Sequence, residues 1–164
     1  MKRNVTTLPP ISGEHLHRNF FDKPGEPTGS GGRHWLAARE AWNRGNEDAA
    51  FELWQAAIRE GVEGPWLSTA YCIVGEVFVK RGDLAAAVDQ FLKCLALPDR
   101  SSENTWESAQ RLYYIYDEAG RSEEAAAVRE LAELMNRRIG WAHMPSVEAE
   151  LRELTRRFLA TGKR

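Results

Sequence analysis

The sequence predicts an all-α protein made of antiparallel helix-turn-helix repeats stacked on one another, with a capping helix at the C-terminal end. Three observations lead to this prediction. Alanine, glutamate, leucine and arginine are abundant while valine and isoleucine are sparse, a composition typical of helices. No stretch alternates polar and apolar residues over the length of a strand. Finally, Gly45, Gly82 and Gly120 lie in similar sequence surroundings.

The first 33 residues differ from the rest of the chain. Residues 1–33 contain four prolines and five glycines and show no helical periodicity, which predicts a flexible N-terminal arm. Within this arm, Leu16, Phe20 and Phe21 are apolar enough to dock on the first helix pair or on a partner. Docking on the protein itself is the simpler alternative.

From His34 onward, short breaks divide the chain into seven expected helices. Side chains that can accept a hydrogen bond from a first helical turn precede four of these helices. These N-cap residues are Asn46, Asp83, Ser122 and Ser146.

The three glycines are followed by small or aromatic residues at spacings of five, nine and twelve. The three sets are Ala50, Trp54 and Ala57, then Ala87, Phe91 and Cys94, then Ala125, Arg129 and Ala132. Upstream, the positions seven and four residues before each glycine also correspond. They hold Ala38 and Ala41, then Gly75 and Phe78, then Tyr113 and Tyr116.

The middle copy is the clearest, and it resembles the tetratricopeptide repeat (TPR). Its signature positions are Tyr71, Val74, Gly75, Phe78, Gly82, Ala87, Phe91 and Cys94, and Pro98 closes the copy. The resemblance spans residues 34–138 and divides them into repeats at about 34–61, 66–98 and 103–138. It implies a short right-handed superhelix in which small residues let two helices approach closely.

The other copies depart from the signature. Gly45, Gly82 and Gly120 are 37 and 38 residues apart, whereas the family repeat has about 34 residues. Residues 53–61 also resemble the related Sel1-type repeat. In the third copy, Arg129 stands in place of the second aromatic residue, and Val128, Leu131 and Met135 supply the apolar stripe.

Residues 146–160 are predicted to form the capping helix, because a stack of repeats exposes its last apolar face unless another element covers it. Val147, Leu151, Leu154 and Phe158 recur at helical spacing on one face. Docking of this helix into a partner's groove is a weaker alternative.

Charge and composition exclude several classes of protein. The formal net charge of −2 does not provide the basic field that nucleic-acid binding needs. No segment is apolar and long enough to span a bilayer. Cys72 and Cys94 have no metal-type or redox-type spacing, so they are expected to be small buried hydrophobic residues in a protein of the cytoplasm.

We found no pattern that predicts catalysis. Residues 29–33 are glycine-rich but lack the lysine of a phosphate-binding loop. His15 and His17 have no acidic or cysteine partner at metal-ligand spacing, and His143 has no nucleophile near it in sequence. We therefore expect no cofactor, no metal and no enzymatic activity.

The resemblance to the TPR family implies that the first helices of the repeats line a concave surface that binds a peptide segment. Counting from each turn glycine predicts the residues of this surface. They are Trp35, Arg39, Trp42 and Asn43 in the first repeat, Cys72, Glu76, Val79 and Lys80 in the second, and Gln110, Tyr114, Asp117 and Glu118 in the third. Trp35, Arg39, Trp42 and Tyr114 are the expected anchors, although Trp35 and Trp42 could instead pack against the N-terminal arm.

A clamp for a terminal carboxylate, as found in chaperone-binding members of the family, is not expected. Arg39 and Arg111 stand at two of its positions, but its asparagines are missing and Glu76 and Glu107 would repel an acidic tail.

The sequence thus predicts an adaptor or scaffold that binds another protein. A dedicated chaperone for an exported protein, of the kind found in bacterial secretion systems, is the alternative. An enzyme is the least favoured reading, and self-association into a homodimer through exposed aromatic residues stays open.

Overall fold

The computed structural model describes residues 25–97 and 102–130 of the 164-residue chain. Within these ranges every regular element is a helix, which confirms the predicted all-α class. The labelled helices are α2 (Gly32–Asn43), α3 (Glu47–Glu60), α4 (Gly64–Lys80), α5 (Leu84–Ala96) and α6 (Ser102–Glu118). Residues 122–130 are also helical.

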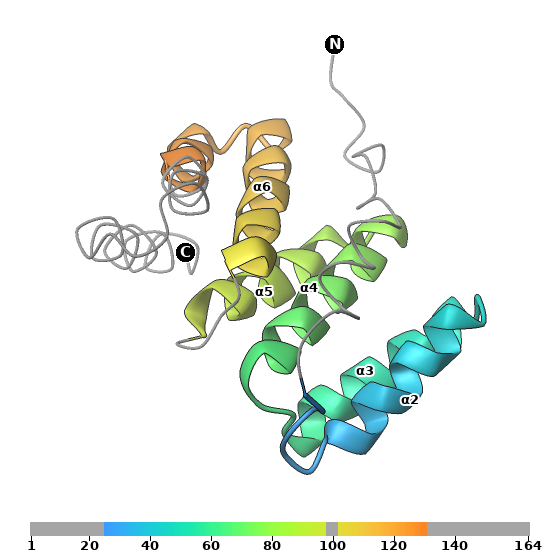
Figure 1. The fold of residues 1–164 in the computed structure, drawn as a ribbon. Coiled ribbons are helices and arrows are strands. Elements are labelled where there is room, and N and C mark those ends of the chain that lie inside the picture. The colour runs from blue at the N-terminus through green and yellow to red at the C-terminus, as the bar shows by residue number, and fades with distance from the viewer. Residues whose placement is uncertain (1–24, 98–101, 131–164) are drawn as a thin grey trace.

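The helices pack in pairs, and neighbouring pairs stack. In Figure 1, α2 and α3 lie side by side at one end of the molecule, α4 and α5 form the middle, and α6 follows at the other end. The helix α4 contacts α3 before it and both α5 and α6 after it. We call α2, α4 and α6 the first helices, and α3, α5 and residues 122–130 the second helices.

The same turn joins the two helices of each pair. Gly45, Gly82 and Gly120 have φ angles of 77°, 78° and 73°, a left-handed conformation that glycine adopts without steric cost. In each turn, the N–H of the residue after the glycine donates to the carbonyl oxygen five residues earlier, as in a Schellman motif. These bonds join Asn46 to Ala41 (2.9 Å), Asp83 to Phe78 (3.0 Å) and Arg121 to Tyr116 (2.9 Å). The sequence repeat is therefore a repeat of backbone geometry.

Two of the predicted N-caps are confirmed. The side chain of Asn46 accepts a hydrogen bond from the Ala49 N–H at 3.2 Å. The side chain of Asp83 accepts one from the Ala86 N–H at 3.1 Å. Each bond satisfies an N–H group that has no partner inside its helix.

The predicted N-cap at Ser122 is wrong by one residue. Helix begins at Ser122, so the cap position falls on Arg121, whose carbonyl oxygen accepts from the Ala125 N–H at 3.0 Å. The turn dictates this position, because the cap must directly follow Gly120, as Asn46 follows Gly45. Arg121 has no side-chain acceptor and instead pairs with Glu124, with Nε 3.0 Å from Oε1.

Two apolar clusters form the core of the described residues. The first joins α2, α3 and the middle of α4, and its largest side chains are Trp35, Trp54 and Ile73. The second joins the end of α4 to α5, α6 and residues 122–130 around Phe91 and Leu112. Burial of such side chains supplies most of the stability of a helical stack.

The helices α4 and α5 approach each other closely at Gly75. A Cβ atom on Gly75 would lie 2.6 Å from Cε1 of the buried Phe91 ring, which is too close for any real contact. The small residue at this position of the repeat therefore makes room for the aromatic residue of the partner helix, as the sequence predicts.

The second helix of the third copy is packed differently from its counterparts. Arg129 is exposed, whereas Trp54 and Phe91 at the matching positions are buried. Val128 is fully buried in its place, as expected from the sequence. The other two residues of that predicted stripe, Leu131 and Met135, lie outside the described residues.

The remaining predictions about organisation also fall outside these ranges. They concern residues 1–24 of the N-terminal arm, the end of the third repeat at residue 138 and the capping helix at 146–160. In the part of the chain that the structure describes, no helix is both long and apolar enough to cross a membrane.

Candidate functional site

The residues predicted to bind a partner lie on α2, α4 and α6, but they do not share one environment. Trp35, a predicted anchor, is only 1% exposed. Its indole N–H donates to the carbonyl oxygen of Trp66 at the start of α4, at 3.1 Å. Trp35 therefore fixes the first helix pair to the second one, and its side chain is not available at the surface.

The other predicted residues of α2 are more accessible. Trp42 is half-buried, with its ring 5.4 Å from that of Trp54, and Asn43 is exposed. The guanidinium of Arg39 lies 5.8 Å from the centre of the Trp35 ring, and Arg39 is partly exposed. The end of α2 thus presents an aromatic face, a cation and an amide.

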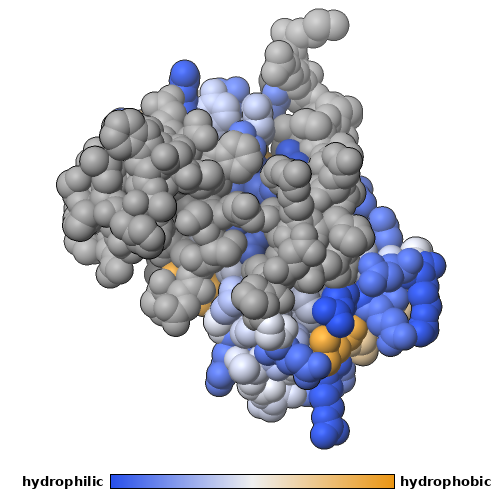
Figure 2. Space-filling model, viewed as in Figure 1, coloured by the Kyte–Doolittle hydropathy of each residue, from blue (hydrophilic) through white to orange (hydrophobic). Residues whose placement is uncertain are grey.

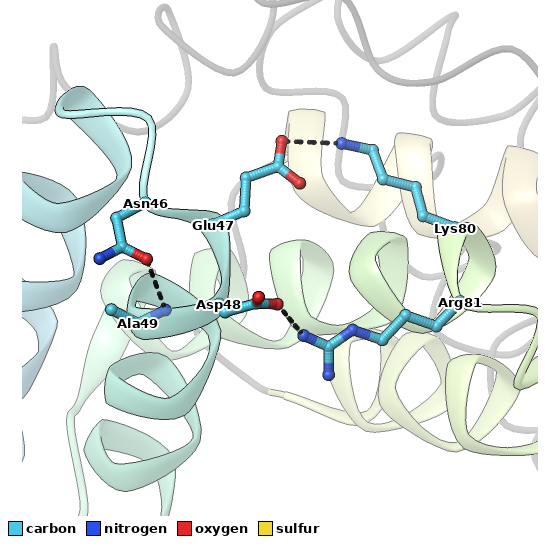
Figure 3. Close-up of polar contacts among 6 residues, drawn as sticks. All are labelled: Asn46, Glu47, Asp48, Ala49, Lys80 and Arg81. Carbon is cyan, nitrogen blue, oxygen red and sulfur yellow. Dashed lines mark hydrogen bonds and ion pairs between the residues drawn. The ribbon is translucent and has the colours of Figure 1, made fainter.

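Lys80, another predicted binding residue, lies next to Trp42 at the junction of the first two helix pairs. Its ammonium is 5.7 Å from the centre of the Trp42 ring and 3.2 Å from a carboxylate oxygen of Glu47. Figure 3 shows a parallel ion pair between Arg81 and Asp48, at 2.7 Å. Lys80 is the last residue of α4 and Arg81 is its C-cap, while Glu47 and Asp48 lie in the first turn of α3. The helix dipoles favour cations at the C-terminal end of α4 and anions at the N-terminal end of α3.

A cluster of ionisable side chains lies between α4 and α6. We call this cluster of Cys72, Glu76, Glu107 and Arg111 the polar cluster. Nε of Arg111 donates to Oε1 of Glu76 at 2.5 Å, and their side chains are only 9% and 8% exposed. A buried charge-assisted bond of this kind fixes the position of one helix against the next.

Cys72 is fully buried in the polar cluster. Its Sγ lies 3.9 Å from Oε2 of Glu107. Burial, followed by the negative charge of Glu107 and the proximity of Cys94 and Glu76, raises the pKa of the Cys72 thiol well above its usual value. The group therefore stays a neutral thiol at physiological pH and is a poor nucleophile.

Further along the same seam, an amide joins two hydroxyl groups. Nδ2 of Asn104 on α6 donates to Oγ of Ser68 at 3.2 Å and to Oγ1 of Thr69 at 2.9 Å. All three residues are buried. The interface between the first helices α4 and α6 is thus polar over several turns.

The predicted residues of α6 lie partly at the surface. Gln110 and Tyr114 are each partly exposed. The Tyr114 ring packs edge-on against Tyr113, with 5.4 Å between ring centres. Asp117 is exposed one turn further along the helix, so α6 combines an aromatic side chain with a nearby acid.

The structure therefore separates the predicted binding residues into two groups. Trp35, Cys72, Glu76 and Val79 are buried and hold the helices together. A second group keeps part of its surface accessible, and we call it the first-helix surface. It consists of Arg39, Trp42, Asn43, Lys80, Gln110, Tyr114, Asp117 and Glu118.

The sequence pattern did not predict a role for Asn104, Ser68 and Thr69. Glu107 and Arg111 were predicted only as positions of a carboxylate clamp. One signal was available. Asn104, Glu107 and Arg111 are spaced three and four residues apart on one face of a helix. A polar stripe on a helix that is expected to pack on both sides indicates a polar interface.

The described residues hold no group of three or more His, Cys, Asp or Glu side chains that could bind a metal ion. On the face drawn in Figure 2, their visible surface is mostly hydrophilic, with small separate hydrophobic areas.

No protein family model, curated protein or solved structure matches the chain. The structure itself defines an all-α protein of paired helices in a repeat-like stack. Any inference about function therefore depends on this architecture and on its first-helix surface.

Proposed function

We propose that this chain is a TPR-type repeat protein that acts as an adaptor and binds a segment of another protein along its first helices. The observation that carries the proposal is the turn at Gly45, Gly82 and Gly120, which has one hydrogen-bond pattern in all three copies. The close approach of Gly75 to Phe91 supports the same assignment, because the TPR signature places a small residue against an aromatic one at these positions.

The proposed binding residues are those of the first-helix surface. Trp42 and Tyr114 offer partly exposed rings, and Arg39 offers a cation. Tryptophan, tyrosine and arginine contribute most to binding energy at protein interfaces. Trp42 is also held in place by Trp54 and Lys80, so a partner would meet a ring that is already ordered.

The proposal does not assign catalysis to the chain. Cys72 is the one thiol of the polar cluster, and its burial raises its pKa and keeps it protonated. A cytoplasmic location is part of the proposal, since reduced buried cysteines such as Cys72 and Cys94 are stable in a reducing compartment.

The proposal can be tested by affinity capture from native lysate with three forms of the full chain. The first is the wild type, and the second is an Arg39→Ala, Trp42→Ala, Tyr114→Ala variant. The third is a control with three exposed residues of the second helices changed, namely Glu52→Ala, Arg59→Ala and Lys93→Ala. Circular dichroism and thermal unfolding establish that each form is folded.

We expect the wild type and the control to retain one specific protein and the first-helix variant to lose it. Overlapping peptides from that protein should then contain one segment that binds the wild type directly. Equal capture by all three folded forms would place binding outside the first-helix surface. Capture of nothing specific by the wild type would remove the support for an adaptor.

A further inference from the structure

The three first helices run parallel, with α4 between α2 and α6. Trp35 near the start of α2 donates to the Trp66 carbonyl oxygen at the start of α4. Near the other end, the Lys80 ammonium lies 5.7 Å from the centre of the Trp42 ring. Three contacts join α4 to α6 at one sequence separation of 35 residues, namely Thr69 to Asn104, Cys72 to Glu107 and Glu76 to Arg111. The C-terminal ends of the three helices therefore meet at the same edge of the stack.

One row of partly exposed side chains crosses this edge. Tyr114 follows Val79 by 35 residues, so it lies level with the last turn of α4. Trp42 on α2, Lys80 on α4 and Tyr114 on α6 make up the row. The charge of Lys80 is balanced by Glu47, whose carboxylate oxygen lies 3.2 Å away. The row thus offers two aromatic rings with a neutralised cation between them.

The charges on either side of this row have no ion-pair partner among the described residues. Arg39 lies one turn before the row on α2, while Asp117 and Glu118 lie about one turn after it on α6. None of these three side chains takes part in an ion pair in the part of the chain that the structure describes. Glu40 and Arg44, the other charges at the end of α2, pair with each other. The surface is therefore positive over α2 and negative over α6.

The two acids at the end of α6 are unfavourable for the helix itself. The C-terminal end of a helix carries a partial negative charge, so anions there cost free energy. A basic residue stands in the last turn of three other helices, namely Arg59 in α3, Lys80 in α4 and Lys93 in α5, whereas α6 has none. Asp117 and Glu118 thus break a rule that these three helices follow, and no ion pair among the described residues compensates them. Such a position indicates a functional site.

The distance between the unpaired charges limits the segment that can bridge them. The axes of packed neighbouring helices lie about 8–10 Å apart, so α6 lies about 18 Å from α2. An extended chain covers this distance in about six residues, whereas a helix needs about twelve. Trp42 and Tyr114 lie between the two charges, where they can contact apolar side chains of the same segment.

We propose that the partner segment is an extended chain with one acidic and one basic side chain about six residues apart. The acidic side chain pairs with Arg39 and the basic one with Asp117 and Glu118. Apolar side chains between them pack on Trp42 and Tyr114. Complementary charges of this kind fix the direction of the segment and disfavour segments with the reverse order. This inference rests on the proposed function, because it names the chemistry of the segment that the first-helix surface binds.

Selection from a phage-displayed library tests the charge order on three forms of the full chain. The library holds random peptides of about 15 residues, long enough for either spacing. The first form is the wild type. The second is a charge-exchange variant, Arg39→Glu, Asp117→Lys, Glu118→Lys. The third is a control on exposed positions of the second helices, Arg59→Glu, Glu52→Lys, Glu130→Lys. Both variants change the formal net charge by the same amount, and circular dichroism establishes that each form is folded.

We expect the wild type and the control to enrich peptides with an acid and a base about six residues apart in one order. The charge-exchange variant should enrich the reverse order. A synthetic peptide selected on the wild type should bind this variant about tenfold more weakly in calorimetry. Exchange of the peptide's own acid and base should restore the affinity. The difference between the two forms should shrink as salt is added.

The results that would overturn this inference differ from those that would overturn the proposed function. Peptides that lose binding to a folded Trp42→Ala, Tyr114→Ala variant but bind the charge-exchange variant as tightly as the wild type would overturn the charge order alone. A spacing of about twelve residues between acid and base would overturn the extended conformation. Peptides that fail to bind only the control, or the absence of any enriched peptide on the wild type, would overturn the charge order and the adaptor together.

Discussion

The helix α4 packs against two neighbours through two kinds of interface. Toward α5 the contact is apolar and close, with Gly75 against the ring of Phe91 and with Ala87 and Cys94 fully buried. Toward α6 the contact is polar, with the Glu76–Arg111 ion pair and the hydrogen bonds of Asn104. The first interface lies within a helix pair and the second lies between pairs.

This difference indicates a division of roles. The apolar interface supplies stability through burial and shape, so it should respond to any change in volume. A buried ion pair adds little net stability, because the cost of removing two charges from water offsets their attraction. The ion pair does penalise arrangements that separate its charges. Glu76 and Arg111 therefore fix the position of one helix pair against the next helix pair.

The largest expected effect comes from the apolar interface. Phe91→Ala should lower the free energy of unfolding by about 4 kcal/mol, because it removes a fully buried ring and leaves a cavity. Urea unfolding followed by circular dichroism measures the change. Lys93→Ala, an exposed neighbour on the same helix, should stay within about 0.5 kcal/mol of the wild type. Equal effects of both changes would show that the packing of α4 on α5 is not as described.

Loss of one partner of the ion pair should have the next largest effect. Arg111→Met leaves the carboxylate of Glu76 buried without its guanidinium, and we expect a loss of about 3 kcal/mol. The double variant Glu76→Met, Arg111→Met removes both charges and should recover most of this loss in the same unfolding experiment. If Arg111→Met lowers the free energy of unfolding no more than a substitution at an exposed position does, the polar cluster does not fix the helix pair of α4 against the helix pair of α6.

Gly75→Ala should have the third largest effect on the free energy of unfolding. The added methyl group collides with the Phe91 ring, and we expect a loss of about 2 kcal/mol from overpacking. The double variant Gly75→Ala, Phe91→Leu should recover part of it, because leucine is smaller than the ring. A gain of about 1 kcal/mol, the usual effect of replacing glycine by alanine in a helix, would contradict the close approach.

These expectations separate what the sequence could predict from what it could not. The turn glycines, the N-caps Asn46 and Asp83 and the close contact at Gly75 follow from local rules that act within a few residues or at a fixed repeat position. The sequence therefore located the helices and the apolar interface. The N-cap at Ser122 was misplaced because it was chosen by residue type, although the turn geometry after Gly120 assigns the position to Arg121.

The candidate site was harder to predict because the burial of a side chain on a first helix depends on how the neighbouring helix pair packs against it. Counting from the glycines placed Trp35 and Cys72 on the predicted binding surface, but Trp66 and Glu107, from the next pair, contact them in the interior. The same count placed Trp42 and Tyr114 at partly exposed positions. Residue spacing thus predicts which helix face a side chain occupies, while the packing between pairs decides whether a partner can reach it.

A smaller effect is expected at the turns. Asp83→Ala removes the side chain that accepts from the Ala86 N–H, and it should lower the free energy of unfolding by about 1 kcal/mol. Asp83→Asn, which can still accept this bond, is the matched control and should be nearly neutral. An equal loss in both variants would point to the charge of Asp83 rather than to its role as a cap.

The smallest effect should arise at the exposed junction of the first two pairs (Figure 3). A double-mutant cycle on Asp48→Ala and Arg81→Ala should give a coupling energy below about 1 kcal/mol, and it should fall as salt is added. The guanidinium of Arg81 also lies 4.1 Å from the centre of the Phe51 ring. Arg81→Ala therefore removes this ring contact as well as the ion pair. Only the double-mutant cycle isolates the interaction energy between Arg81 and Asp48. A coupling as large as the effect of Arg111→Met would mean that charge holds this junction together. A small one would leave that role to Trp35, which is buried between α2 and α4 and bonded to the Trp66 carbonyl.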